Sequence, residues 1–433
     1  MVNATREHRF VDREETRRQP EPGFHAGTYV TTRCNRPAFP PLVSGRGELV
    51  RDALGRILID FSSQTQNLNF GQCHPKIVAA VQEAAGTLTF ASSRFMPEAA
   101  LELAQRIVSV APEGMNRINL KMCNGSDAVE GAIKMARKFT GKGRIISLIG
   151  AHHGESIETM KLSDKHDGKS FLGDASLFSH IPPPYREVDD TASINACESV
   201  LKAGDVAAVI VEPVLVNGGA IVLSKGYLAH LKHLCEQYGA LLIFDEIQTA
   251  FGWLGERFAS GYFGVTPDIL TLGKGISGGF PLAAILFNEE HDVLDYGEHD
   301  FTYGAHPLSC AAALAVLDLL EETNVLAEVP GKGRRLAAGL EAIKSDSGIV
   351  GEIRHAGMIL GMEMVDSDGI PAPHLAAKVF RECLAKGLLA RVSQDGKGNV
   401  ILIKPPLIIR EECITRGLDV VGEVVRNAGE SED

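Results

Sequence analysis

Short apolar runs alternate with amphipathic stretches through the middle of the chain. Between about residues 118 and 290 these runs are predicted to be strands, at residues 145–149, 207–211, 241–245, 269–272 and 282–287. Runs this short and this uniformly apolar are typical of strands that are covered on both faces. The pattern therefore predicts an α/β fold, in which helices cover a largely parallel sheet.

The flanking segments have different patterns. Residues 48–61 predict a hairpin, and residues 76–86 and 97–110 predict helices. After Pro307 an Ala- and Leu-rich helix is predicted to run to about residue 322. We therefore expect three parts, which are an N-terminal segment with part of a small domain at 1–75, a large domain at 76–318 and a C-terminal small domain at 319–433.

Composition narrows the class of protein. A chain of 433 residues that is 45% hydrophobic can bury a large core. Its net charge of −12 argues against nucleic acid and acidic membrane surfaces as partners. We find no apolar run of membrane-spanning length and no apolar N-terminal leader. We expect a protein that has neither a nucleic-acid nor a membrane partner.

The eight cysteines are scattered along the chain and form no Cys-x-x-Cys pair. In so large a chain this pattern indicates reduced thiols rather than a disulfide or zinc framework. The sequence therefore predicts no metal site and a cytoplasmic location.

Lys274 follows the apolar run 269–272 and lies between Gly273 and Gly275. A lysine there does not fill a core, and the glycines allow a large group to approach the backbone. Such a lysine is a candidate for forming a Schiff base with a carbonyl group. By itself, Gly-Lys-Gly is also compatible with an ordinary loop that carries an exposed cation.

Asp245 ends the apolar run 241–245 and precedes Lys274 by 29 residues. That length allows one crossover and a return to a neighbouring parallel strand. Pyridoxal 5′-phosphate (PLP) chemistry needs such a pair. A lysine binds the cofactor aldehyde, and a carboxylate keeps the pyridine nitrogen protonated so that the ring accepts electrons. Asp245 and Glu246 are also compatible with a solvated acidic pair at a strand end.

Gly125 and Ser126 follow Asn124 at the start of a segment with apolar residues at helical spacing. The N-terminus of a helix offers N–H groups and a dipole that attract a phosphate. Asn-Gly-Ser-Asp is also an ordinary N-cap sequence. It indicates a phosphate site only in combination with the motifs around Lys274 and Asp245.

In this order the motifs resemble the class III (omega) aminotransferases, which are PLP-dependent enzymes of fold type I. The resemblance runs from about Gly47 to Arg410. It is carried by Asp60-Phe61, Gly71-Gln-Cys-His74-Pro75, Asn124-Gly125-Ser126-Asp127-Ala128, His152-His153-Gly154, Val211-Glu212-Pro213, Phe244-Asp245-Glu246-Ile247-Gln248-Thr249, Thr266-Pro267-Asp268, Gly273-Lys274-Gly275 and Phe301-Thr302-Tyr303-Gly304-Ala305-His306-Pro307.

The resemblance implies an enzyme that moves an amino group between an amine or amino acid and a keto acid or aldehyde. Lys274 would carry PLP as a Schiff base and then act as general base. Asp245 would contact the pyridine nitrogen and Gln248 the phenolic oxygen of the cofactor. Gly125 and Ser126 would hold its phosphate.

Two further roles follow from the same resemblance. Thr302 resembles the residue that reaches the phosphate of the neighbouring subunit's cofactor, which implies a homodimer with shared active sites. Glu212 resembles a glutamate beside the cofactor that takes part in gating the substrate carboxylate. A strand-end carboxylate satisfied by a nearby amide or arginine is the alternative interpretation of Glu212.

Two positions depart from the family pattern. His152 stands where members usually place an aromatic residue that stacks on the cofactor, and an imidazole can stack there but can also exchange a proton. Leu402 stands where many members that act on amino acids carry an arginine for the α-carboxylate. Leucine cannot replace a bidentate guanidinium. The candidate substitutes are Arg94, Lys404 and Arg391, although an exposed loop arginine and a surface lysine are also compatible with the first two.

Three functions are therefore compatible with the sequence. We favour an aminotransferase, whose partners are a small-molecule amino donor and a carbonyl acceptor. The second is a class III relative that directs PLP to racemisation, decarboxylation, elimination or replacement, or carbon–carbon bond formation. The third, which the intact lysine, carboxylate and phosphate motifs disfavour, is a catalytically silent PLP-binding protein.

Overall fold

The computed structural model describes residues 39–92, 94–163 and 170–429 of the chain. Its largest sheet has seven strands in the order β4-β12-β11-β10-β7-β5-β6. The strands are β4 (Arg117–Met122), β5 (Arg144–Leu148), β6 (Phe178–Ile181), β7 (Val206–Val211), β10 (Leu241–Asp245), β11 (Ile269–Leu272) and β12 (Ala283–Phe287). The strand β12 runs antiparallel to both of its neighbours, and the other pairs are parallel. The predicted α/β fold with a mostly parallel sheet is confirmed.

The direction of β12 follows from its connection. Only residues 273–282, which include the short 3₁₀ turn η3 (Lys274–Ile276), link β11 to β12. A parallel neighbour needs a crossover of a dozen or more residues. The apolar run at 282–287 therefore predicts the strand correctly but not its reversal, and the more polar strands β4 and β6 do not stand out as apolar runs.

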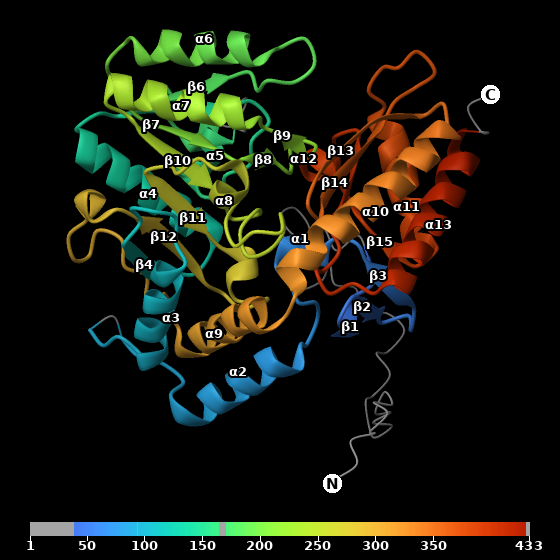
Figure 1. Ribbon diagram of the computed structural model, residues 1–433, viewed down its shortest axis with the longest axis horizontal. Coiled ribbons are helices and arrows are strands. Elements are labelled where there is room, and N and C mark those ends of the chain that lie inside the picture. The colour runs from blue at the N-terminus through green and yellow to red at the C-terminus, as the bar shows by residue number, and fades with distance from the viewer. Residues whose placement is uncertain (1–38, 93, 164–169, 430–433) are drawn as a thin grey trace.

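Helices cover both faces of this sheet (Figure 1). On one face lies α4 (Gly125–Thr140), and on the other lie α7 (Lys225–Tyr238) and, beyond it, α6 (Asp190–Leu201). Along β10, Ile243 belongs to the core cluster under α4, whereas Phe244 belongs to the cluster under α7. Burial on both faces explains why these strands appear in the sequence as continuous apolar runs.

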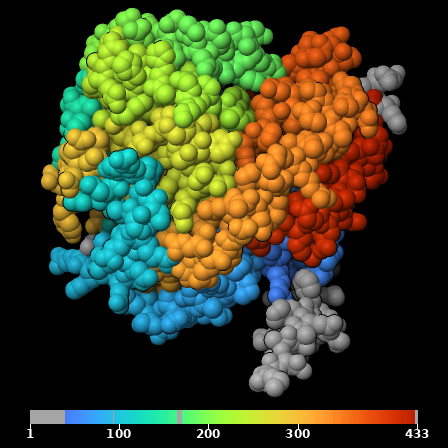
Figure 2. Space-filling model, viewed as in Figure 1, coloured from blue at the N-terminus to red at the C-terminus, as the bar shows by residue number. Residues whose placement is uncertain are grey.

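The C-terminal part of the chain forms a smaller antiparallel sheet in the order β13-β14-β17-β16. The helices α10 (Val325–Ser345) and α11 (Pro373–Ala385) pack on this sheet, and α13 (Glu411–Gly429) packs on both helices. Figure 2 shows these orange and red segments packed directly against the yellow and green ones. The strands are β13 (Val350–Ala356), β14 (Ile359–Met364), β16 (Arg391–Val392) and β17 (Val400–Ile403).

A third sheet joins residues 42–60 to the C-terminal part of the chain. The predicted hairpin is present as β2 (Leu49–Asp52) and β3 (Ile57–Asp60), with β1 (Leu42–Arg46) beside β2. On the other side β15 (Leu388–Leu389) pairs with β3. The division of the chain near residues 75 and 318 stays a prediction. The pairing of β3 with β15 supports it, because it joins the N-terminal segment to the C-terminal part. Of the predicted first part, 1–75, residues 1–38 lie outside the described residues.

The predicted helices are confirmed as α2 (Pro75–Thr87), α3 (Glu98–Ser109) and α9 (Pro307–Glu322). Pro75 and Pro307 each occupy the first turn of their helix, where the missing N–H costs no hydrogen bond. In the described part of the chain, no helix is both long and apolar enough to cross a membrane.

A left-handed turn, α1 (Ser63–Gln66), follows β3 and is not evident from the sequence. Its four residues have φ values of 47°, 47°, 68° and 65°. Residues with side chains cost roughly 1–2 kcal/mol each in this conformation, so tertiary contacts must hold the turn. Ser63 Oγ donates to the carbonyl of Lys404 at 2.7 Å, and Gln66 Nε2 donates to the carbonyl of Gln248 at 2.9 Å. The turn therefore ties the segment after β10 to the segment after β17.

Candidate active site

A cavity of about 390 Å³ lies at the carboxyl ends of the parallel strands, which is where ligands bind in sheets of this type. Asp245, Lys274 and Glu212 reach it from the ends of β10, β11 and β7. Many of the predicted site residues meet in its lining, namely Gly125, Ser126, His152, Glu212, Asp245, Gln248 and Lys274.

Asp245 is held in one orientation at the base of this cavity. Register places Asp245 opposite Thr271 on the parallel neighbour β11. Its Oδ1 accepts hydrogen bonds from Thr271 Oγ1 and from the backbone N–H of Ile247, both at 3.2 Å. Its Oδ2 lies 2.7 Å from His153 Nδ1. A buried carboxylate with three such contacts has little freedom to turn.

His153 is a site residue that the sequence does not identify. Since an ionised carboxylate can only accept, we assign the Nδ1 proton to the bond with Asp245. The other ring nitrogen, Nε2, is buried and has no hydrogen-bond partner among the described residues. The contact joins positions 92 residues apart, so the sequence signal is limited to the place of His153 beside His152.

Lys274 begins η3 with a φ of 45°, which is unusual for a residue with a side chain. Burial lowers the pKa of its ammonium to about 8, although the charges of Asp245 and Glu212 act in the opposite direction. A lysine with a lowered pKa offers more neutral amine near neutral pH. Lys274 therefore has both the position and the protonation behaviour of a nucleophile.

The first turn of α4 forms the other end of the cavity. Asn124 caps the helix, since its side chain accepts from the N–H of Asp127 at 3.1 Å while the Asp127 carboxylate bonds back to Asn124. The N–H groups at the start of a helix have no partner within the helix. A side chain at Gly125 would place Cβ 2.7 Å from Ile247 Cδ1, so only glycine fits without movement.

Glu212 lies between His152 and Gln248. Its Oε1 accepts from the N–H of His152 at 2.8 Å, and its Oε2 accepts from Gln248 Nε2 at 3.2 Å. Burial, with a smaller contribution from the charge of Asp245, raises the pKa of Glu212 to about 7. Glu212 thus lines the cavity, as expected of a glutamate beside the cofactor. Its carboxylate also accepts a hydrogen bond from the Gln248 amide, as expected of an ordinary strand-end carboxylate.

The raised pKa of Glu212 predicts a stability that depends on pH. A carboxyl whose pKa is raised on folding contributes stability that is fully present below its unfolded value near 4.5 and is lost as pH rises through about 7. Replacing Glu212 by glutamine removes this charge. The free energy of unfolding of the apoprotein should therefore exceed that of the unmodified protein by up to about 3 kcal/mol more at pH 8 than at pH 5. Thermal melts of the apoprotein at both pH values measure this difference.

Glu113→Gln is the control, because Glu113 is exposed. Its melting temperature should follow that of the unmodified protein at both pH values. A Glu212→Gln protein that did the same would contradict the assignment of a destabilising charge to Glu212.

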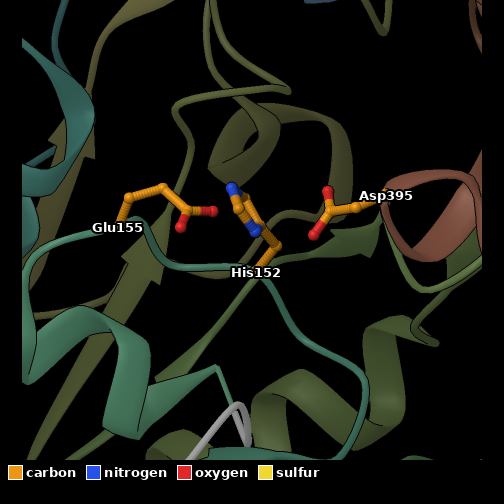
Figure 3. Close-up of side chains that lie close together, drawn as sticks. All are labelled: His152, Glu155 and Asp395. Carbon is orange, nitrogen blue, oxygen red and sulfur yellow. The ribbon is translucent and has the colours of Figure 1, made fainter. Parts of the chain in front are cut away.

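Three side chains lie close together in Figure 3, and two of them, His152 and Glu155, line the cavity. The possible ligand atoms of His152, Glu155 and Asp395 all lie within 4.8 Å of one another. The imidazole of His152 lies between the two carboxylates. Asp395 comes from a second left-handed turn, α12 (Ser393–Gly396), beside the small sheet. The cluster places negative charge where the loop after β5 meets α12.

The remaining predicted residues lie elsewhere. Thr302 is exposed in the loop before α9 and does not line the cavity of its own chain. Arg94 is exposed in a turn and does not line it either. The surface interpretation of Lys404 is wrong, because its exposed fraction is 2%. The chain turns inward after β17, where the N–H of Lys404 donates to the carbonyl of Phe61 at 2.6 Å.

The residues present fit PLP. A buried carboxylate suits the pyridine nitrogen, an amine of lowered pKa suits the aldehyde, and a helix N-terminus suits the phosphate. These groups line one cavity, and the glycine at its phosphate end leaves the backbone accessible.

Comparison with known proteins agrees with this geometry. A family model described as Aminotransferase class-III matches residues 30–425. The 5-aminovalerate aminotransferase DavT of Pseudomonas aeruginosa is 35% identical over 397 residues, which are 88% of this chain and 93% of that protein. An alanine/serine racemase of Pyrococcus horikoshii is 30% identical over 411 residues, which are 89% of this chain and 86% of the racemase. The crystal structure of a transaminase from the marine bacterium Virgibacillus superposes with a TM-score of 0.84 at 28% identity, and the match covers 90% of this chain and 94% of that one.

Proposed function

The chain belongs to the class III aminotransferases and is a PLP-dependent enzyme, and we propose that Lys274, Asp245 and Glu212 carry its chemistry. The observation that carries the proposal is the arrangement of Asp245 and Lys274. They reach one cavity from adjacent parallel strands, opposite the first turn of α4. The reaction is the transfer of an amino group between a small amino donor and a carbonyl acceptor.

When bound, PLP supplies an aldehyde that links to amines and a ring that draws electrons from the substrate carbon. We assign Lys274 Nζ two duties, which are to hold the cofactor covalently and, once released, to move the proton of the substrate carbon. Asp245, oriented by His153 and Thr271, holds a proton on the pyridine nitrogen. Its burial excludes water, so its charge acts at full strength on that proton.

The other lining residues position the cofactor and the substrate. The backbone N–H groups of Gly125 and Ser126 are suited to hold the phosphate, and Gln248 to donate to the phenolic oxygen. His152 lies at the position suited to contact the face of the ring. Glu212 lies beside His152 and Gln248, where its charge influences how a substrate carboxylate is placed.

A panel of amines and amino acids tests the proposal. The relatives include proteins named for 5-aminovalerate, 4-aminobutyrate and acetylornithine, so the panel should include amino acids with a terminal amine. A transaminase converts the cofactor from its aldehyde form to its amine form with a donor, and a keto acid restores it. Absorbance follows the cycle, and mass spectrometry identifies the product. Inversion of an amino acid with no need for a keto acid would instead indicate racemase chemistry, which one relative's name describes.

We also propose a homodimer whose active sites are shared. Thr302 lies in a loop whose neighbours Phe301 and Tyr303 are exposed, and the Tyr303 ring contacts that of Phe90, which is also exposed. A group of exposed aromatic side chains is typical of a surface that another protein covers. In a closed two-fold dimer, each subunit would then place Thr302 near the cofactor of its partner.

Tyr303→Asp should weaken the dimer, because it places a charge in an apolar contact. We expect the unmodified enzyme to sediment at twice its chain mass of 46.5 kDa and the variant to shift toward the monomer and lose activity. Ile370→Asp is the control, since Ile370 is similarly exposed in a turn of the small domain. An unmodified enzyme that is fully active as a monomer at assay concentration would exclude the shared site.

We also propose that the protein is located in the cytoplasm. The seven cysteines among the described residues are all free thiols, which agrees with a reducing compartment. The net charge of −12 likewise favours small molecules over nucleic acid as partners.

A further inference from the structure

Arg391 on β16 lies directly beside Leu402 on the neighbouring strand β17. The two residues pair in the antiparallel register of β16 with β17. Side chains of directly paired residues project from the same face of a sheet. Arg391 therefore shares the face on which the arginine absent at position 402 would lie. Lys404 comes directly after β17, where the chain turns inward and the N–H of Lys404 donates to the carbonyl of Phe61.

Among the described residues, neither cation is held in a salt bridge, although the charge of Asp395 acts on Arg391. Lys404 has an exposed fraction of 2%, and Arg391 is half-buried. In the part of the chain that the structure describes, neither side chain forms a salt bridge, and the ammonium of Lys404 donates no hydrogen bond. Burial of an uncompensated cation costs several kcal/mol, so the buried ammonium of Lys404 and the guanidinium of Arg391 together favour an anion as their ligand.

The electrostatic interactions of this pair extend to Lys274. Burial lowers the pKa of Lys404 well below its usual value, and the charges of Arg391 and Lys274 lower it further. Burial also lowers the pKa of Arg391, an effect that the nearby carboxylate of Asp395 opposes. Three cations thus influence one another, with Arg391 on β16 and Lys404 directly after β17.

The carboxylates near Lys404 have other partners. Asp60 accepts hydrogen bonds from Ser62 and Gln64. Glu212 accepts from His152 and Gln248, as described above. Their charges raise the pKa of Lys404 only in part, because burial and the neighbouring cations dominate.

We propose that Arg391 and Lys404 form the subsite that binds the carboxylate of the amino substrate, in place of the arginine that Leu402 replaces. This inference rests on the proposed aminotransferase function and names its substrate class, which is amino compounds that carry a carboxylate rather than simple amines. A guanidinium supplies a planar, two-point contact, and an ammonium supplies a point charge beside it. Such a pair both neutralises the carboxylate and orients the molecule, so that its amine faces Lys274.

Binding of glutarate to the holoenzyme tests the subsite without any reaction, because glutarate has a carboxylate at each end and no amine. Titration calorimetry should show that Arg391→Leu and Lys404→Met each raise the Kd for glutarate at least about 30-fold, the lower limit for loss of one partner of a buried charged contact. Lys397→Met removes an exposed lysine of the neighbouring turn and should change the Kd less than twofold. Replacing a buried cation by an apolar side chain of similar size should preserve folding, and a thermal melt with a cofactor absorbance spectrum checks this.

Turnover separates this inference from the proposed function. With 5-aminopentanoate as donor, kcat/KM should fall at least about 30-fold in both variants, whereas with pentylamine it should change less than threefold. If both variants bind glutarate as tightly as the unmodified enzyme, the subsite is wrong even where transamination proceeds. If no donor reacts in the unmodified enzyme but glutarate binding still depends on both residues, the subsite stands and the proposed reaction fails.

The double variant Arg391→Leu with Leu402→Arg adds a positional test. It places a guanidinium at position 402 on β17, on the same face of the sheet as position 391. We expect the double variant to bind glutarate at least about tenfold more tightly than Arg391→Leu alone. A folded double variant that binds no more tightly than the single variant would contradict the shared face.

Discussion

Replacement of Lys274 by alanine is expected to abolish the reducible link between enzyme and cofactor and to lower turnover by at least about three orders of magnitude. The loss combines covalent attachment with general-base catalysis, which alone contributes roughly 10²–10⁴-fold. Borohydride reduction followed by peptide mass spectrometry should locate PLP on Lys274 in the unmodified enzyme and on no lysine in the variant.

The variant should still bind PLP, because the start of α4 and Asp245 are unchanged. Its absorbance should be that of the free aldehyde. Lys202→Ala, which removes an exposed lysine, should leave both the link and the turnover intact. Fixation of PLP to any lysine other than Lys274 would overturn the assignment.

Replacement of Asp245 by asparagine is expected to lower kcat by at least about 10³-fold while PLP stays linked to Lys274. Asparagine is nearly isosteric, so the contacts with Thr271 and Ile247 can persist. The negative charge is lost at the point where the ring must stay protonated, and loss of one such contact costs about 10²–10³-fold or more in a buried site. Steady-state kinetics and the cofactor absorbance spectrum measure the two effects separately.

Asp419→Asn is the control for this change, because Asp419 is exposed on α13. His153→Ala should lower kcat in the same direction as Asp245→Asn but by a smaller factor, since His153 acts by orienting Asp245. An Asp245→Asn enzyme with near-normal turnover would show that the ring nitrogen is held by another group.

The sequence was sufficient to predict five of the seven strands of the large sheet and its ligand-binding edge. Strands buried on both faces appear as continuous apolar runs, and Asp245 and Lys274 are evident because Asp245 ends such a run and Lys274 follows another after a single glycine. A helix start with Asn, Gly and Ser indicates its own cap, since capping depends on residues within one turn. These features are local, and local features can be predicted from neighbouring residues.

Other features depend on contacts between distant segments. The bond between His153 and Asp245 spans 92 residues, and the strained turn 63–66 exists because segments near Gln248 and Lys404 hold it. The reversal of β12 depends on how a ten-residue connection returns to the sheet. Without the fold, none of these partners can be identified, because the sequence gives spacing along the chain but no distance in space.

For the substrate-binding residues, too, some features follow from the sequence and others only from the tertiary structure. The sequence by itself determined that position 402 carries leucine and that Arg94, Lys404 and Arg391 could supply a cation instead. Only the tertiary structure decided where these three residues lie: it leaves Arg94 exposed, buries Lys404 and pairs Arg391 with Leu402 on neighbouring strands. The physical reason is that strand register and burial are set by the packing of the whole small domain, whereas the identity of a residue is fixed at its own position.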